Sequence, residues 1–167
     1  KFGWTVELWA PDASDLYGRA NAAHIAVDAV PFRGTLDPVS LLAVRKLLCR
    51  RQADLVVTHS SIDSWVVGLA SRTVLRRPRI IRTRHLSTPI RNALSYKWFP
   101  DAICTTSDAI RQGIVRHGIS QDKVKTIATG VDMSRFRPRP DKKIEMRKKY
   151  GLPETAPLVG GVFVIRS

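Results

Sequence analysis

Short apolar runs alternate with longer stretches of helical pattern along most of the chain. The apolar runs, each closed by polar residues, lie at residues 4–10, 25–32, 54–60, 79–85, 101–106 and 124–129. The stretches with the length and composition of helices lie at residues 15–24, 37–51, 62–75 and 107–118, while residues 86–100 are predicted to be irregular. Strands joined by helices of this length form βαβ units with parallel strands. The pattern therefore predicts an α/β fold with a largely parallel sheet.

A strand–helix–strand unit at residues 53–87 carries a histidine at the end of each strand. His59 closes the first strand and His85 closes the second. Parallel sheets bind ligands at the carboxyl ends of their strands, so both imidazoles are predicted to lie at a binding edge. An imidazole there can hydrogen-bond a sugar hydroxyl or a phosphate at a pH near neutrality. The alternative is that each is an ordinary surface or core histidine.

Four predicted strands end in small polar or histidine residues. These endings are Thr58-His59-Ser60, Thr83-Arg84-His85, Thr105-Thr106-Ser107 and Thr129-Gly130. Three of them precede or open helical or loop segments, where unpaired backbone N–H groups favour an anion. Taken singly, each serine or threonine is more simply explained as a helix cap. Their repetition at four strand ends favours a polar rim along one edge of the sheet.

The chain is strongly basic and otherwise ordinary in composition. It carries a formal charge of +14 over 167 residues, which favours an acidic partner such as an anionic lipid surface or a phosphorylated ligand, although a solvated basic surface explains it equally well. The basic clusters at residues 76–79 and 135–149 lack interleaved aromatic side chains, so we do not expect nucleic acid as a partner. Cys49 and Cys104 are predicted to be two buried thiols in a reducing compartment.

Several catalytic signatures are absent from the sequence. It contains neither a G-x-x-x-x-G-K-[ST] phosphate loop nor a G-x-G-x-x-G dinucleotide fingerprint. The four histidines and two cysteines show no metal-ligand spacing, so no metal site is predicted. Asp63 follows His59 by four residues, but it falls in the first turn of a predicted helix, where a carboxylate is ordinary.

The composition changes at about residue 135 and predicts a domain boundary there. Residues 1–134 are expected to form the first domain, residues 135–155 a basic linker with a short charged helix, and residues 156–167 the first strand of a second domain. The chain begins at Lys1 without a methionine and stops directly after an apolar run. We therefore expect it to be a fragment that extends in both directions.

Four segments in this order resemble the N-terminal half of a family 4 glycosyltransferase with the GT-B fold. They are residues 56–61 (VVTHSS), 82–87 (RTRHLS), 101–107 (DAICTTS) and 129–138 (TGVDMSRFRP). The Gly-Val-Asp…Phe-x-Pro ending is the most specific of them. The resemblance implies that the first domain is Rossmann-like and mainly holds the acceptor, while the missing C-terminal domain holds a nucleotide-sugar donor.

The resemblance also implies an activity and a set of site residues. It implies a retaining transferase of the hexosyltransferase type, with a nucleotide sugar as donor substrate and no cofactor. The acceptor is expected to be a glycan or lipid-linked sugar in cell-envelope polysaccharide biosynthesis, and the enzyme to be cytoplasmic, at the inner membrane face. His85 is expected close to the transferred sugar and Arg166 on the donor diphosphate. The substrate-binding residues are expected to be His59, Ser60, Arg84, Thr106, Ser107, Gly130 and Asp132.

The sequence departs from the family pattern in three places, and two alternatives stay open. The family's first strand, glycine-rich loop and first helix should precede Lys1, its Glu-x7-Glu region should follow Ser167, and Thr129 stands where many relatives have asparagine. The fragment alone is therefore expected to be inactive. A GT-B-fold sugar-nucleotide epimerase is one alternative. A basic, non-catalytic module that binds an anionic surface or nucleic acid, in a salt-sensitive manner, is the other.

Overall fold

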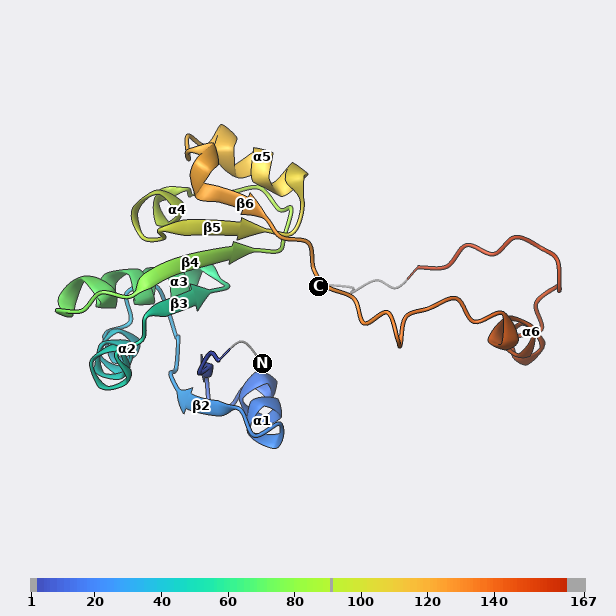
Figure 1. Cartoon of the computed structure of the whole chain (residues 1–167), viewed down its shortest axis with the longest axis horizontal. Coiled ribbons are helices and arrows are strands. Elements are labelled where there is room, and N and C mark those ends of the chain that lie inside the picture. Colours follow the sequence, from blue (N-terminus) through green and yellow to red (C-terminus); the bar gives the residue numbers. More distant parts are fainter. Residues whose placement is uncertain (1–2, 91, 162–167) are drawn as a thin grey trace. The chain divides into compact units, whose positions relative to one another are not determined.

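The computed structural model describes residues 3–90 and 92–161 (Figure 1). The chain divides into two compact units, residues 1–129 and residues 130–167. The division falls five residues before the predicted end of the first domain, so the Gly130-Val-Asp132 segment belongs to the second unit.

The first unit is built on parallel strands, as the sequence predicts. The strands β1 (Glu7–Ala10) and β2 (Ala26–Ala29) form one parallel pair. The second sheet has the order β3-β4-β5-β6 and contains β3 (Leu55–Thr58), β4 (Arg79–Arg84), β5 (Ala102–Thr105) and β6 (Val124–Thr126). All its neighbours are parallel. The α/β prediction is confirmed, but the described strands form two sheets instead of one.

The helices of the first unit begin where side-chain caps are available. They are α1 (Asp15–Ala22), α2 (Pro38–Arg51), α3 (Ser61–Ala70), α4 (Leu94–Trp98) and α5 (Asp108–Arg116), with single 3-10 turns at Ser71–Thr73 and Gln121–Lys123. Four of these helices have an N-cap side chain that accepts a backbone N–H of the first turn: Ser14, Asp37, Ser60 and Ser107. Pro38 occupies the first position of α2, where its missing N–H costs nothing.

Three predicted boundaries differ from the structure. The helix α3 ends at Ala70, not at residue 75, because the Ser71 hydroxyl donates to the Gly68 carbonyl and the chain tightens into a 3-10 turn. The stretch predicted to be irregular contains the short helix α4. The strand β6 ends at Thr126, not at Thr129, because β5, its one neighbour among the described strands, has already turned into α5.

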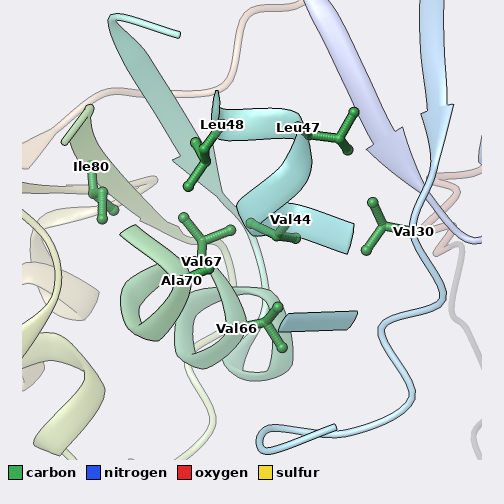
Figure 2. Packing of buried hydrophobic residues seen from close by; sticks show 8 residues of the cluster. All are labelled: Val30, Val44, Leu47, Leu48, Val66, Val67, Ala70 and Ile80. Atoms are coloured by element: carbon green, nitrogen blue, oxygen red, sulfur yellow. The ribbon is translucent and has the colours of Figure 1, made fainter. Parts of the chain in front are cut away.

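The larger of two buried clusters joins the end of β2 to α2, α3 and β4. Figure 2 shows its members, which are Val30, Val44, Leu47, Leu48, Val66, Val67, Ala70 and Ile80. Their exposed fractions lie between 0% and 6%. Val44 and Leu48 form one apolar face of α2 in this cluster, and Leu41 packs beside them. This cluster fixes α2 and α3 against the strands that carry the two histidines.

The smaller cluster covers the other end of the second sheet. It contains Tyr96, Ile103, Ile114, Ile119 and Val124. Ile103 and Val124 are paired across β5 and β6, and Ile114 of α5 packs over them. Gly118, with φ of +78°, lies two residues after the end of α5 and turns the chain away from the helix, at the position where the sequence predicts the helical stretch to end.

The two cysteines do not match the prediction of two buried thiols. Cys49 is exposed on α2, whereas Cys104 on β5 is half-buried. Both are free, and burial raises the pKa of the Cys104 thiol. Cys49 was predicted wrongly because it lies on the outward arc of α2, next to the basic residues.

The described part of the second unit, residues 130–161, contains the helix α6 (Pro140–Lys149), in the charged segment where a short helix is predicted. Arg147 is 8% exposed because its guanidinium donates to the carbonyls of Pro153 and Ala156, which folds the following segment back onto the helix. Residues 156–161 are not in a strand. The remainder of the strand predicted for residues 156–167, with Arg166, lies outside the described residues.

Candidate functional site

The carboxyl ends of β3 and β4 bring the two predicted histidines together. Thr58 pairs with Arg82 in the parallel register, so His59 follows beside Thr83, and His85 follows one residue beyond the end of β4. The two imidazole rings stack, with centroids 5.9 Å apart and planes inclined by 11°. Both side chains are exposed, so the pair presents a ring face and polar nitrogens to solvent. The structure thus brings together the two residues on which the sequence-based site depended.

Thr83 determines which nitrogen of His59 carries its proton. The Thr83 hydroxyl lies 3.1 Å from the Thr58 carbonyl oxygen and 2.8 Å from Nδ1 of His59. A hydroxyl has one proton, and a carbonyl can only accept. Both hydrogen bonds form only when Thr83 donates to the carbonyl and the Nδ1–H of His59 donates to Thr83. This network therefore assigns the lone pair of neutral His59 to Nε2, which can accept a hydrogen bond from a ligand hydroxyl.

Ser60 and Asp63 hold the first turn of α3 in a reciprocal cap. The Asp63 carboxylate accepts the backbone N–H groups of His59 and Ser60, each at 2.8 Å, and the Ser60 hydroxyl accepts the N–H of Asp63 at 3.3 Å. This is a capping box, and it fixes the backbone directly after β3. Ser60 was predicted to bind substrate, but its side chain serves the helix cap. Asp63 has the ordinary first-turn position expected of it.

Arg84, a predicted substrate-binding residue, is held by neighbouring groups of the fold. Its guanidinium donates to the Tyr96 hydroxyl at 2.7 Å and to the carbonyl of Thr88. The side chain is half-buried and ties the segment after β4 to α4. Arg84 therefore shapes the site by fixing this segment.

Arg82 was missed by sequence reasoning and lies buried beneath the same edge. It is 2% exposed, and its guanidinium carbon lies 3.4 Å from the centroid of the Tyr96 ring. It also donates to the hydroxyls of Ser61, at 3.3 Å, and of Ser95. Burial lowers its pKa from the usual arginine value. The only sequence signal was strand alternation, which places Arg82 on the same face of β4 as Ile80.

The polar residues after β5 include the cap of α5, in agreement with the simpler of the two explanations offered for them. The Ser107 hydroxyl accepts the N–H of Ile110 at 3.4 Å, and Thr105 donates to the Ser107 carbonyl at 3.2 Å. Thr106 is half-buried beside them. The β4–β5 register pairs Arg84 with Thr105, so Thr106 follows beside His85 at this edge, while the Ser107 side chain serves the helix cap.

The remaining predicted residues lie in the second unit or outside the residues that the structure describes. Gly130 is exposed, and it does not close a strand, because β6 ends at Thr126. The Asp132 carboxylate accepts from the Ser134 hydroxyl at 2.5 Å and from the backbone N–H groups of Ser134 and Arg135. These hydrogen bonds, the Ser134 hydroxyl first, lower the pKa of Asp132. Arg166 lies outside the described residues.

A cavity of about 440 Å³ lies between the segment after β4 and the helix α5. Its size suits a small ligand. Its lining mixes cationic or basic side chains with apolar ones and includes Arg84, Arg116 and His117 beside Leu86, Pro89 and Ile110. An amphipathic or hydroxyl-rich ligand would meet both kinds of group there. The sequence missed this cavity because it depends on how α5 packs against an irregular segment.

Across residues 3–90 and 92–161, no cluster of three or more His, Cys, Asp or Glu side chains could hold a metal ion. Among the same residues, no helix combines the length and the apolar composition that crossing a membrane requires.

Comparison with solved structures shows similar folds. A crystal structure of a glycosyltransferase from Rickettsia africae is 20% identical, has a TM-score of 0.66, and is matched over 90% of this chain and 42% of its own length. Structures of HepE from Anabaena in complex with UDP and with UDP-glucose are 18% identical, with TM-scores of 0.65 and 0.63, over 86% of this chain and 42% of theirs. The chain thus spans less than half the length of these proteins.

The comparison of sequences is more specific. No curated protein matches the chain. The family model described as Glycosyltransferase Family 4 matches residues 1–135, which is most of the chain and includes the whole histidine edge. The structural matches agree with it, since the parallel sheet flanked by helices is the Rossmann-like fold of the N-terminal domain of GT-B glycosyltransferases. The chain therefore belongs to glycosyltransferase family 4.

Proposed function

We propose that this chain is the acceptor-side part of a glycosyltransferase that moves a sugar from a nucleotide-sugar donor to a glycan or lipid-linked acceptor. The observation that carries the proposal is the stacked pair of His59 and His85 at the carboxyl edge of the sheet, fixed by Thr83. Family membership supports sugar transfer. The HepE complexes contain UDP, UDP-glucose and glucose, which supports a nucleotide sugar as the donor.

The histidine pair suits the recognition of a sugar. Nε2 of His59 can accept a hydrogen bond from a sugar hydroxyl, because Thr83 keeps the proton on Nδ1. His85 stacks on His59 and is proposed to lie beside the transferred sugar, where it orients the reacting carbon. The capping box of Ser60 and Asp63 holds the His59 backbone, so the pair is positioned before the ligand binds.

The cavity beside α5 is the proposed acceptor pocket. Its apolar residues, Leu86, Pro89 and Ile110, can contact the faces of sugar rings or the start of a lipid chain. Arg116 can contact an acceptor phosphate. Arg84 links this cavity to the histidine edge through the segment that it holds.

The finer features of the enzyme are part of the same proposal. We propose a retaining hexosyltransferase of cell-envelope polysaccharide biosynthesis that acts in the cytoplasm, with Arg166 on the donor diphosphate and Gly130 and Asp132 at the substrate. Family membership favours transfer over the epimerase alternative. An epimerase would also need no acceptor pocket such as the one proposed beside α5. A basic binding module would not require two histidines held in a fixed arrangement.

The test uses the complete protein that carries this chain. It is incubated with a panel of labelled nucleotide sugars and a membrane-lipid extract, next to the His85→Ala variant. We expect transfer in the parent and a loss of about 100-fold or more in the variant, typical of the removal of a group that orients the reacting centre. His24→Asn is the matched control, because His24 is an exposed histidine in a turn with positive φ that asparagine tolerates.

Two outcomes would contradict the proposal. Transfer from no donor, together with salt-sensitive binding to vesicles or nucleic acid, would favour the basic binding module. Full transfer by the His85→Ala variant would show that His85 does not act at the reacting sugar.

A further inference from the structure

Gly113 lies inside α5, at a position where the helix gains nothing from a glycine. It belongs to the helix Asp108–Arg116, and its φ is not positive, so no left-handed backbone conformation requires a glycine there. A glycine in a helix interior disfavours folding about fivefold relative to alanine. The backbone of α5 would therefore be more stable with almost any other residue at this position.

Close packing does not require a glycine at this position either. A Cβ added at Gly113 would meet no atom of the described residues within 4 Å. Gly68 on α3 is the opposite case, because a Cβ there would collide with the ring of Phe99. Gly113 is nevertheless half-buried, so the space beside it is enclosed in part by the fold.

The space beside Gly113 is the cavity between α5 and the segment after β4. The cavity is lined from α5 by Ala109, Gly113, Arg116 and His117, among others. Ala109 and Gly113 are the two smallest residues of the lining, and they lie one turn apart on the same face of the helix. The wall between them is helix backbone. Glycine is the residue that allows a ligand to approach a backbone closely.

We propose that Gly113 is a specificity-determining residue that leaves room for the ring of an acceptor sugar against α5. The proposal rests on the proposed function, in which this cavity is the acceptor pocket. The ring occupies the part of the cavity beside Gly113, and an apolar substituent of the acceptor contacts Leu86 and Pro89. Any side chain at position 113 takes part of this room, so its size sets the largest acceptor that enters.

Transfer kinetics of the complete protein test the proposal. Gly113→Ala and Gly113→Leu are compared with the parent, using the donor and acceptor that support transfer in the parent. One extra methylene in a fitted pocket changes kcat/KM by about 10–200-fold. We therefore expect kcat/KM for the acceptor to fall about tenfold in Gly113→Ala and at least about 100-fold in Gly113→Leu. The KM for the donor, measured from its hydrolysis without acceptor, is expected to stay unchanged.

Gly18 provides the matched control. It lies inside α1, a Cβ there would also meet no atom of the described residues within 4 Å, and it is not part of the cavity lining. Urea unfolding is expected to show that Gly18→Leu and Gly113→Leu are both at least as stable as the parent, because leucine favours a helix over glycine. Only Gly113→Leu is expected to lose transfer. Damage to the fold cannot explain a variant that gains stability and loses its acceptor.

Binding measured without transfer separates a failure of this inference from a failure of the proposed function. The probe is hexyl β-glucoside, whose hydroxyl-rich ring and apolar tail match the two kinds of group in the lining. ¹⁵N NMR follows the backbone N–H groups of Ile110 and His117. We expect the probe to shift both signals in the parent and in Gly18→Leu, and to produce no saturable shift in Gly113→Leu.

The outcomes distinguish the two proposals. A parent that transfers no sugar but binds the probe as expected would contradict the proposed function and support the role of Gly113. Transfer and probe binding by Gly113→Leu at the level of the parent would overturn the role of Gly113 and leave the proposed function standing. An equal loss in Gly18→Leu, or no shift by the probe in the parent, would also overturn it.

Discussion

Gly68, in the last turn of α3, faces the ring of Phe99 with no space for a side chain. A Cβ added at this position would lie 2.2 Å from Cγ of Phe99, and 2.4 and 2.7 Å from its Cδ atoms. The ring cannot easily move away, because Phe99 is 3% exposed, Trp65 packs edge-on against it with centroids 5.0 Å apart, and the Arg72 guanidinium lies 4.7 Å above it. Gly68→Ala therefore forces the core to rearrange.

Two opposing terms decide the size of the effect. Alanine in a helix interior gains about 1 kcal/mol over glycine. Overpacking of a well-packed core costs about 1–3 kcal/mol, and a contact this short belongs at the upper end. We therefore expect Gly68→Ala to lower the free energy of unfolding by about 2 kcal/mol, a shift in Tm of roughly 6 °C.

The comparison with a second glycine makes the test selective. Gly113 lies inside α5, and a Cβ there would meet no atom within 4 Å, so Gly113→Ala is expected to stabilise the protein by up to about 1 kcal/mol. Urea unfolding followed by circular dichroism measures both variants against the parent. If Gly68→Ala proved as stable as the parent, the close packing of α3 on Phe99 would be wrong.

Three further predictions concern the edge of the sheet and the pair β1 and β2. Thr83→Val keeps the shape of the side chain but removes the acceptor for His59 Nδ1–H, so ¹⁵N NMR is expected to show a mixture of His59 tautomers. In the complete enzyme, kcat/KM is expected to fall about tenfold while the free energy of unfolding changes little. An unchanged tautomer would refute the assignment. Asp63→Ala removes the acceptor of two backbone N–H groups and is expected to cost about 1–2 kcal/mol in urea unfolding, against no loss for Asp122→Ala on the surface. Burial, followed by a hydrogen bond to Asp28, raises the pKa of Glu7, so the folded state binds this proton more tightly than the unfolded chain, and the resulting stability is lost as the pH rises through the raised pKa. The stability of Glu7→Gln relative to the parent should therefore increase as the pH rises above the ordinary glutamate pKa of about 4, and a decrease would contradict the sign of the shift.

The sequence alone was sufficient where the determining interactions are local. The helix starts at residues 37 and 107 could be predicted because the side chains of Asp37 and Ser107 each bond a backbone group two or three residues away. The parallel strands follow from the helices between them. His59 and His85 could be assigned to one edge because strand direction in a βαβ unit determines where both strands end.

Interactions between distant segments could be decided only by the tertiary structure. The hydrogen bond from His59 to Thr83 depends on the register of β3 with β4, and the burial of Arg82 depends on how α4 places Tyr96 over it. The structure also decided that the described strands form two sheets and that β6 stops at Thr126. The physical reason is that local patterns report the backbone conformation of a few residues. The partner of a buried or edge side chain is set by packing between segments that the sequence separates.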